Sequence, residues 1–130
     1  MTIKELSQLY YLNQEIEQEK YRLQELEAAA TNTAVKISGL PHVKGMSGKT
    51  AIAAQIADCK AVIEAKVQLS VVEYNRLNRY IANVQDSLVR QIFTLRFVKG
   101  LSWNRVAMSV GGGNTADGVR KQVTRYLKQS

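Results

Sequence analysis

The chain has 130 residues, one cysteine, one histidine and a formal net charge of +7. This length fits one domain, or one small domain with a helical extension. A single cysteine excludes an intrachain disulfide, and together with a single histidine it cannot build a zinc site of the usual kind, so we expect no metal. No apolar run is long enough to span a membrane, and the charged N-terminus lacks the apolar core of a signal peptide. We therefore expect a cytoplasmic protein.

The positive charge is confined to the second half of the sequence. Residues 1–70 carry eight bases and eight acids, whereas residues 71–130 carry ten bases and three acids. A basic half beside a neutral half favours a polyanionic partner for the basic half, most often nucleic acid. The plainer alternative is a basic surface without a partner.

Residues 3–30 are predicted to form one helix. Its apolar residues recur with the seven-residue spacing of a coiled coil, and only Glu19 interrupts the pattern. The positions on this stripe are Leu9, Leu12, Ile16, Leu23, Leu26 and Ala30. Such a helix packs either on a second copy or on its own chain, and the spacing leaves both alternatives open.

Residues 31–49 are rich in glycine and contain the only proline, Pro41, which predicts a loop. A second long helix is predicted over 51–82, with Thr50 as its N-cap. Its apolar stripe holds Ile52, Ile56, Cys59, Ile63, Val67, Tyr74, Leu77 and Ile81, with Ser70 on the same face. We expect residues 1–82 to be an oligomerisation or spacer region, formed by a helical hairpin or a coiled coil.

A short helix is predicted to follow Asp86, which is a good N-cap residue. Its predicted buried face consists of Leu88, Ile92 and Leu95. Gly100 predicts the end of this helix, because glycine adopts the left-handed conformation of a helix C-terminus without strain.

Two more helices are predicted near the C-terminus. Ser102 is the expected cap of a helix over 103–110, and Thr115 is the expected cap of a helix that ends near Lys128. The glycines of segment 111–114 predict a turn between them. The expected fold is all-α, with the long N-terminal helices followed by a small three-helix domain over 83–130.

The last two predicted helices have the spacing of a helix-turn-helix. Ala107 supplies the small residue where the helices cross, and Gly111, four positions later, supplies the turn. Apolar residues of the last helix would pin it to the others: Val119, Val123, Tyr126 and Leu127.

Residues 84–128 resemble region four of sigma factors. The matching residues are Arg96-Phe97 of LRF, the run KGLSW at 99–103, Val106-Ala107, and the V-R…R-Y-L pattern over 119–127. The chain is especially similar to small phage-encoded regulators of late transcription that join this module to an N-terminal helical segment. The turn is about two residues longer than usual. Nothing in the sequence corresponds to the other promoter-binding regions of a complete sigma factor.

The resemblance implies sequence-specific binding of duplex DNA by a phage or prophage transcriptional regulator in a bacterial cell. At 100° per residue, the face of the last helix opposite Val119 and Val123 would meet the DNA. The residues expected to enter the groove are Thr115, Asp117, Lys121 and Thr124. Those expected to hold phosphates are Arg120, Arg125 and Lys128, helped by Ser102 and Arg105. Gly118 lies inside this helix and disfavours it by roughly 1 kcal/mol relative to alanine.

Two alternative functions fit the same pattern. A DNA-packaging protein of the small-terminase type also joins a helix-turn-helix to an oligomerising helical segment, and an adaptor would use the module to bind RNA polymerase instead of DNA. We expect that the chain is not an enzyme and binds no cofactor, because the sequence shows no nucleophile–base pair and no pair of carboxylates. Gly48-Lys49-Thr50 ends like a phosphate-binding loop, but Val43 stands where that loop needs its first glycine.

Overall fold

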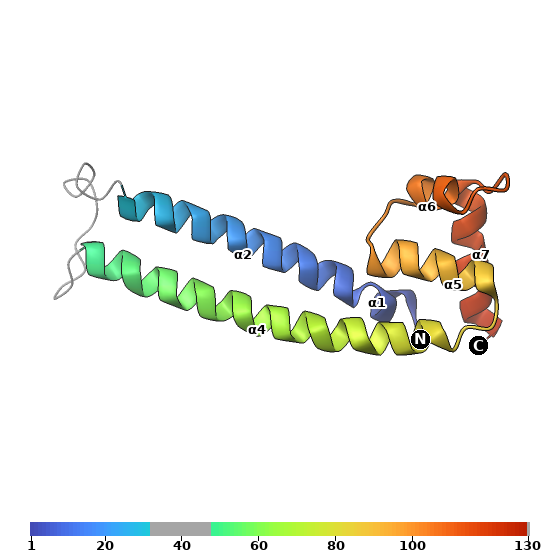
Figure 1. Cartoon of the computed structure of the whole chain (residues 1–130), viewed down its shortest axis with the longest axis horizontal. Helices are drawn as coiled ribbons and strands as arrows, with labels where there is room; N and C mark the ends of the chain where they lie inside the picture. The colour runs from blue at the N-terminus through green and yellow to red at the C-terminus, as the bar shows by residue number, and fades with distance from the viewer. Residues whose placement is uncertain (32–47, 130) are drawn as a thin grey trace. The chain divides into compact units, whose positions relative to one another are not determined.

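The computed structural model describes residues 1–31 and 48–129, which are largely helical and include no strand (Figure 1). This confirms the all-α prediction. Most of the predicted loop over 31–49, with Pro41 and Val43, lies outside the described residues. Helix α4 (Gly48–Ala82) agrees with the predicted second helix but begins earlier than expected. Thr50 therefore lies inside the helix, and its prediction as the N-cap was wrong.

The chain divides into two compact units. The first, here called the discontinuous unit, comprises Met1–Leu12 and Ser70–Ser130, and the second, the hairpin unit, is the unbroken segment Asn13–Leu69. This division differs from the boundary predicted after residue 82. The reason is that Leu6 and Leu77, from the two long helical segments, are buried in the same core as the C-terminal helices.

The first predicted helix is divided at Ser7 into α1 (Ile3–Leu6) and α2 (Gln8–Thr31). The Thr2 hydroxyl caps α1 by accepting a hydrogen bond from the backbone N–H of Glu5 at 3.2 Å. The Ser7 hydroxyl donates to the carbonyl of Ile3 at 2.8 Å. Such local side-chain bonds compete with regular helix geometry, which accounts for the break that the apolar spacing did not predict.

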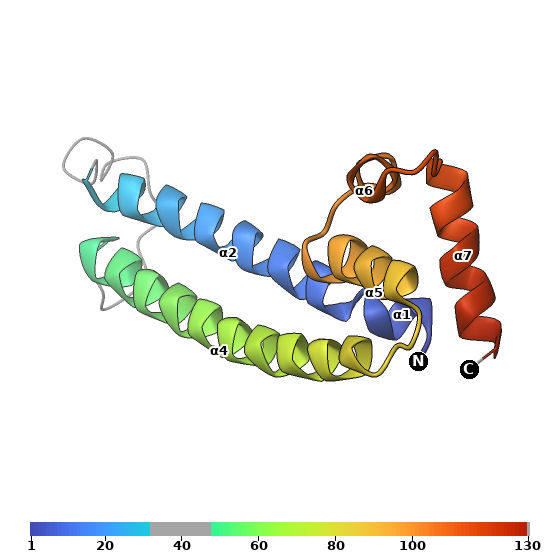
Figure 2. The same cartoon turned by 45° about the vertical axis from the view of Figure 1, so that its right-hand side comes forward.

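In the hairpin unit, α2 and α4 run side by side in opposite directions (Figures 1 and 2). The stripe of α2 faces α4, so Ile16 and Cys59 are buried between them. The Cys59 thiol lies 3.4 Å from the carbonyl oxygen of Glu19 and 3.6 Å from its carboxylate. Burial raises the pKa of this thiol, and the hydrogen bond to Glu19 raises it further. The heptad-like stripe is thus used within one chain.

The inner face of α4 differs from the predicted stripe at two positions. Val67 and Tyr74 are 39% and 48% exposed, whereas their neighbours Lys66 and Glu73 are half-buried. In the hairpin unit, the Lys66 ammonium forms an ion pair with Glu15 at 3.0 Å. In the discontinuous unit, Glu73 pairs with an arginine one turn away at 2.8 Å. These ion pairs compensate for the desolvation of Lys66 and Glu73. The inner face of α4 therefore continues from Cys59 in steps of three and four residues that include Lys66 and Glu73.

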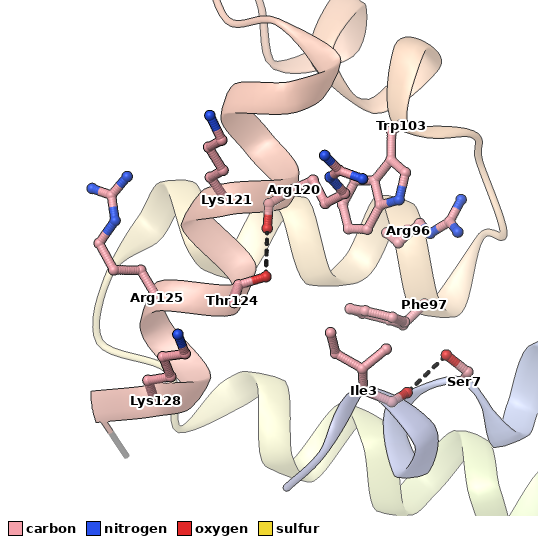
Figure 3. Close-up of a pocket in the computed structure, with 10 residues that line it drawn as sticks. All are labelled: Ile3, Ser7, Arg96, Phe97, Trp103, Arg120, Lys121, Thr124, Arg125 and Lys128. Carbon is pink, nitrogen blue, oxygen red and sulfur yellow. Dashed lines mark hydrogen bonds between the residues drawn. The ribbon is translucent and has the colours of Figure 1, made fainter.

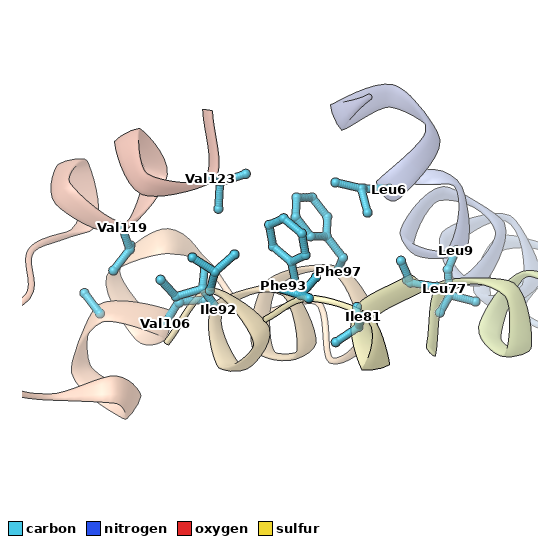
Figure 4. Packing of buried hydrophobic residues seen from close by; sticks show 13 residues of the cluster. Leu6, Leu9, Leu77, Ile81, Ile92, Phe93, Phe97, Val106, Val119 and Val123 are labelled. Atoms are coloured by element: carbon cyan, nitrogen blue, oxygen red, sulfur yellow. The ribbon is translucent and has the colours of Figure 1, made fainter. Parts of the chain in front are cut away.

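The discontinuous unit has one apolar core, to which both ends of the chain contribute (Figure 4). It includes Leu6, Leu9, Leu77, Ile81, Ile92, Phe93, Phe97, Val106, Val119 and Val123. Phe93 lies at its centre and is completely buried. Its ring stacks with Tyr80 at 6.2 Å between centroids and meets the edges of Phe97 and Tyr126 at 5.7 and 5.6 Å. The aromatic cluster thus joins α4 to the C-terminal helices.

Helix α5 (Ser87–Phe93) begins as predicted after Asp86, whose carboxylate accepts hydrogen bonds from the backbone N–H groups of the second and third helical residues at 2.8 and 3.2 Å. Of the predicted buried face, Ile92 is fully buried, but Leu88 and Leu95 are only half-buried. Val89 and Phe93 are buried instead. Because α5 packs against both α6 and α7 and contributes to the core shared with the N-terminal helices, more than one of its faces is covered.

The last turn before Gly100 is a π-helix, η2 (Thr94–Val98), where an α-helix was expected. The backbone N–H of Lys99 donates to the carbonyl of Thr94 at 3.0 Å, five residues earlier, which widens the turn. Gly100 then ends the helix with a φ of +71°, as predicted. A side chain there would also meet the ring of Tyr10, which lies 3.3 Å from the position of a Cβ atom.

Candidate nucleic-acid interface

Helices α6 (Trp103–Val110) and α7 (Ala116–Gln129) pack against each other and against α5, as a helix-turn-helix requires (Figure 2). The hydroxyl of Ser102 accepts from the N–H of Arg105 at 3.3 Å, and that of Thr115 accepts from the N–H of Gly118 at 3.0 Å. Both predicted caps are thereby confirmed. In the turn, Gly111, Gly112 and Gly113 have φ values of +64°, +63° and +77°.

The pinning residues of α7 lie as the sequence predicted. Val119 and Val123 are buried, Tyr126 and Leu127 pack against the same core, and Ala107 is buried on α6. Because these residues occupy one side of α7, the charged side chains of the helix are left on its outer surface.

The outer surface of α7 forms one wall of a cavity of about 630 Å³ (Figure 3). We call it the basic cavity. It is lined by Ile3, Ser7, Arg96, Phe97, Trp103, Arg120, Lys121, Thr124, Arg125 and Lys128. Five of these residues are cations and none is an acid, whereas two aromatic rings and Ile3 make part of the wall apolar. Such a lining suits phosphate groups attached to a less polar body.

The residues predicted to contact DNA fall into two groups in the structure. Those that line the basic cavity are Arg120, Lys121, Thr124, Arg125 and Lys128. Those that lie outside it are Ser102, Arg105, Thr115 and Asp117. The hydroxyls of Ser102 and Thr115 serve as helix caps, and the Arg105 side chain is exposed on α6. The structure therefore brings together the predicted residues of α7 from Arg120 onward, and not those at its start.

Asp117 partly neutralises two of the cavity's cations. Its carboxylate accepts a hydrogen bond from the guanidinium of Arg120 and lies 3.5 Å from the ammonium of Lys121. The bond from Arg120 holds the pKa of Asp117 below its ordinary value, and the charge of Lys121 lowers it further. The acid therefore remains ionised at neutral pH and offers an acceptor at the start of α7.

Thr124 is fixed on its own helix. Its hydroxyl donates to the carbonyl of Arg120 at 3.2 Å (Figure 3). That bond uses the hydroxyl proton but leaves the oxygen lone pairs able to accept hydrogen bonds.

Arg96 and Trp103 are site residues that sequence reasoning did not assign to DNA contact. The guanidinium carbon of Arg96 lies 4.5 Å from the centroid of the Trp103 ring, and its Nη1 donates to the carbonyl of Leu101 at 2.9 Å. The sequence carried only an indirect signal, since Arg96 and Trp103 belong to the runs that resemble region four. Arg96 lies within η2, a π-helical turn that no local pattern predicts.

The wall formed by α1 was also not predicted. Ile3 and Ser7 reach the basic cavity, and α1 is held to α4 by Arg76. The Arg76 guanidinium donates to the carbonyl of Glu5 at 3.1 Å and to the carboxylate of Glu73 at 2.8 Å. The hydrogen bond to Glu73 raises the pKa of Arg76, so this link stays charged.

Over residues 1–31 and 48–129, no three histidine, cysteine or acidic side chains gather in a way that could hold a metal ion. None of the helices in this part of the chain combines the length and the apolar character needed to cross a membrane. Comparison of the chain with models of known protein families, with curated proteins and with solved structures finds no match.

Proposed function

We propose that the chain binds duplex DNA through α7 and the basic cavity, as a transcriptional regulator of the phage type. The observation that carries the proposal is the gathering of Arg96, Arg120, Lys121, Arg125 and Lys128 around one cavity that no acid lines. Lysine and arginine side chains that neutralise phosphates release the counterions condensed on the DNA, and this release is a large source of affinity for DNA.

The helical geometry supports the same proposal. A capped helix whose inner side is pinned by Val119 and Val123 presents its outer side to a groove, and its first turn offers Asp117 and Thr115 to base edges. We assign the later residues, Arg125 and Lys128, to the phosphates at the groove edge. The resemblance to region four of sigma factors leads to the same division of roles.

The experiment is a fluorescence-anisotropy titration of labelled duplexes across a salt series. One duplex has random sequence and one comes from the DNA that flanks the gene. The double variant Lys121→Ala/Arg125→Ala should reduce the slope of log affinity against log salt by up to about 1.8, since each lost phosphate contact reduces it by about 0.9.

A matched control removes the same charges elsewhere. Lys60→Ala/Arg79→Ala takes one lysine and one arginine from exposed positions of α4 and should leave the slope unchanged. If neither duplex binds the wild-type chain at low salt, DNA binding is rejected, and a protein partner such as RNA polymerase becomes the better explanation of the basic surface.

We further propose that the chain acts as an oligomer joined through its long helices. The support is that α4 exposes large apolar side chains that a soluble helix usually covers. In the hairpin unit they are Val62, Val67 and Leu69, and in the discontinuous unit Val71, Val72 and Tyr74. Residues 1–70, which include Val62, Val67 and Leu69, have no net charge, so two copies can meet along this segment without net repulsion.

A further inference from the structure

The side chain of Trp103 is fixed on the wall of the basic cavity. It is the first residue of α6, directly after the Ser102 cap, and its ring meets the edge of Phe97 at 6.4 Å between centroids and an angle of 88°. Phe97 is itself buried and packs on Phe93 at the centre of the core. The indole is therefore a rigid part of the wall.

Arg96 is held against this ring by two contacts. The guanidinium carbon lies 4.5 Å from the ring centroid, and Nη1 donates to the carbonyl of Leu101. A guanidinium has five N–H groups, so the bond to Leu101 leaves donors for a ligand. None of the ion pairs among the described residues involves Arg96. Its charge is therefore fixed in place but is not neutralised by a neighbouring acid.

Figure 3 shows Arg96 and Trp103 on one side of the basic cavity and Lys121, Arg125 and Lys128 along α7 on the other. The two sides are held differently. The lysines and arginines of α7 are exposed, so they lose side-chain freedom when they bind a phosphate. Arg96 has already lost that freedom in the unbound protein.

We propose that Trp103 is a positioning residue for DNA binding, which holds the Arg96 guanidinium in the geometry that meets a backbone phosphate. This inference rests on the proposed function. It predicts that loss of the ring weakens binding only through Arg96 and leaves the number of phosphate contacts unchanged, because the cation itself remains.

The test is a double-mutant cycle, measured by anisotropy with one labelled duplex. Trp103→Leu should weaken binding roughly three- to five-fold, because the Arg96 side chain, no longer held, must lose its freedom when it binds the phosphate. Trp103→Phe keeps an aromatic face under the guanidinium and should bind within about two-fold of the wild type. In the Arg96→Ala background, Trp103→Leu should cause no further loss, because the group that it positions is absent.

The salt slope provides a readout that a purely structural role of Trp103 would not produce. Arg96→Ala should reduce the slope by about 0.9, whereas Trp103→Leu should leave it at the wild-type value. Thermal unfolding followed by circular dichroism confirms that each variant is folded at the temperature of the titration.

Two results would overturn the positioning role while leaving DNA binding intact. One is an equal loss of affinity from Trp103→Leu with and without Arg96, and the other is a Trp103→Phe variant as weak as Trp103→Leu. Failure of the wild-type chain to bind the duplex at low salt would instead reject the proposed function and the positioning role together.

Discussion

The carboxylate of Asp117 accepts a hydrogen bond from the guanidinium of Arg120, one turn further along α7. The same carboxylate faces Lys121, so one acid neutralises two of the cations proposed to meet DNA. We expect Asp117→Asn to strengthen binding to random-sequence duplex several-fold at low salt, because a charge that repels phosphate is lost and two cations are released.

The same variant should reduce the preference for the duplex from the flanking DNA over the random-sequence duplex. The reason is that an aspartate at the start of such a helix accepts hydrogen bonds from base edges. Both effects are measured by anisotropy with the two duplexes. Asp58→Asn, at an exposed position of α4, removes the same charge far along the sequence and serves as the control. Weaker binding of Asp117→Asn to both duplexes would show that the carboxylate contributes to affinity itself.

The ion pairs of Asp117 also predict a dependence of stability on pH. Because its pKa is lowered in the folded chain, the carboxylate stabilises the fold at pH values above the unfolded pKa, which is about 3.9. This contribution is lost as the pH falls through the folded pKa. The difference in the free energy of unfolding between wild type and Asp117→Asn should therefore be constant near neutrality and diminish in acid. Urea denaturation at a series of pH values measures it, and a difference that grows in acid would contradict the assigned direction.

Phe93 is expected to be the residue on which the discontinuous unit depends most. Phe93→Ala should lower the free energy of unfolding by about 3–5 kcal/mol, since it removes a buried ring that touches three other aromatic side chains. Met108→Ala changes a side chain that is 81% exposed and should have little effect. Equilibrium urea denaturation of both variants provides the comparison, and similar losses of stability in the two would show that the ring is not a packing centre.

Gly100→Ala separates backbone strain from a steric contact. The position has a φ of +71° and faces the ring of Tyr10, so alanine should lower the free energy of unfolding by more than the roughly 1–2 kcal/mol of the strain alone. Gly113 has a φ of +77°, and a Cβ atom there would have no other group within 4 Å. Gly113→Ala therefore measures the backbone strain without a steric contact. If the two variants are equally destabilised, the Tyr10 ring moves aside and the contact adds no loss of stability.

Self-association is expected to depend on the outer face of α4. Val62 and Leu69 lie seven residues apart and therefore share one side of the helix. Val62→Glu/Leu69→Glu should shift the chain from an oligomer to a monomer in sedimentation-velocity experiments without loss of helix content. Gln68→Glu/Asn75→Glu adds the same charge at exposed polar positions on a different side of α4 and should leave the oligomer intact.

The size of the oligomer discriminates between the functions that the sequence suggests. A dimer suits a regulator that reads two half-sites, whereas a ring-sized oligomer with weak sequence preference suits a packaging protein. If the wild-type chain sediments as a monomer, the proposal that the long helices form an oligomerisation region is rejected.

The features that could be predicted from the sequence are those set by a few adjacent residues. Asp86, Ser102 and Thr115 cap helices because their side-chain oxygens reach N–H groups only two or three positions away. Gly100 ends a helix because its backbone conformation needs no distant partner. The three-helix arrangement near the C-terminus was predictable for the same reason.

The features that were missed depend on distant residues. Lys66 occupies an inner position of α4 because Glu15 lies opposite and pairs with it. No sequence pattern near Lys66 predicts that partner. Arg96 pairs with Trp103, a residue of the next helix, from within the π-helical turn of η2, which the sequence did not predict. The compact units differ from the predicted boundary after residue 82, because residues near both chain ends share a core with the helices between them.

The division of the chain has a consequence for the order in which it folds. Leu6 and Val123 lie in the same core, so that core is completed only when segments far apart in the sequence meet. The hairpin unit is a contiguous segment, and its contacts, such as that between Glu19 and Cys59, join residues closer in the sequence than Leu6 and Val123. Antiparallel pairing of α2 and α4 shortens the effective loop between the two segments of the discontinuous unit. The long helices thus favour the folding of a core whose two segments are separated in the sequence by the hairpin unit.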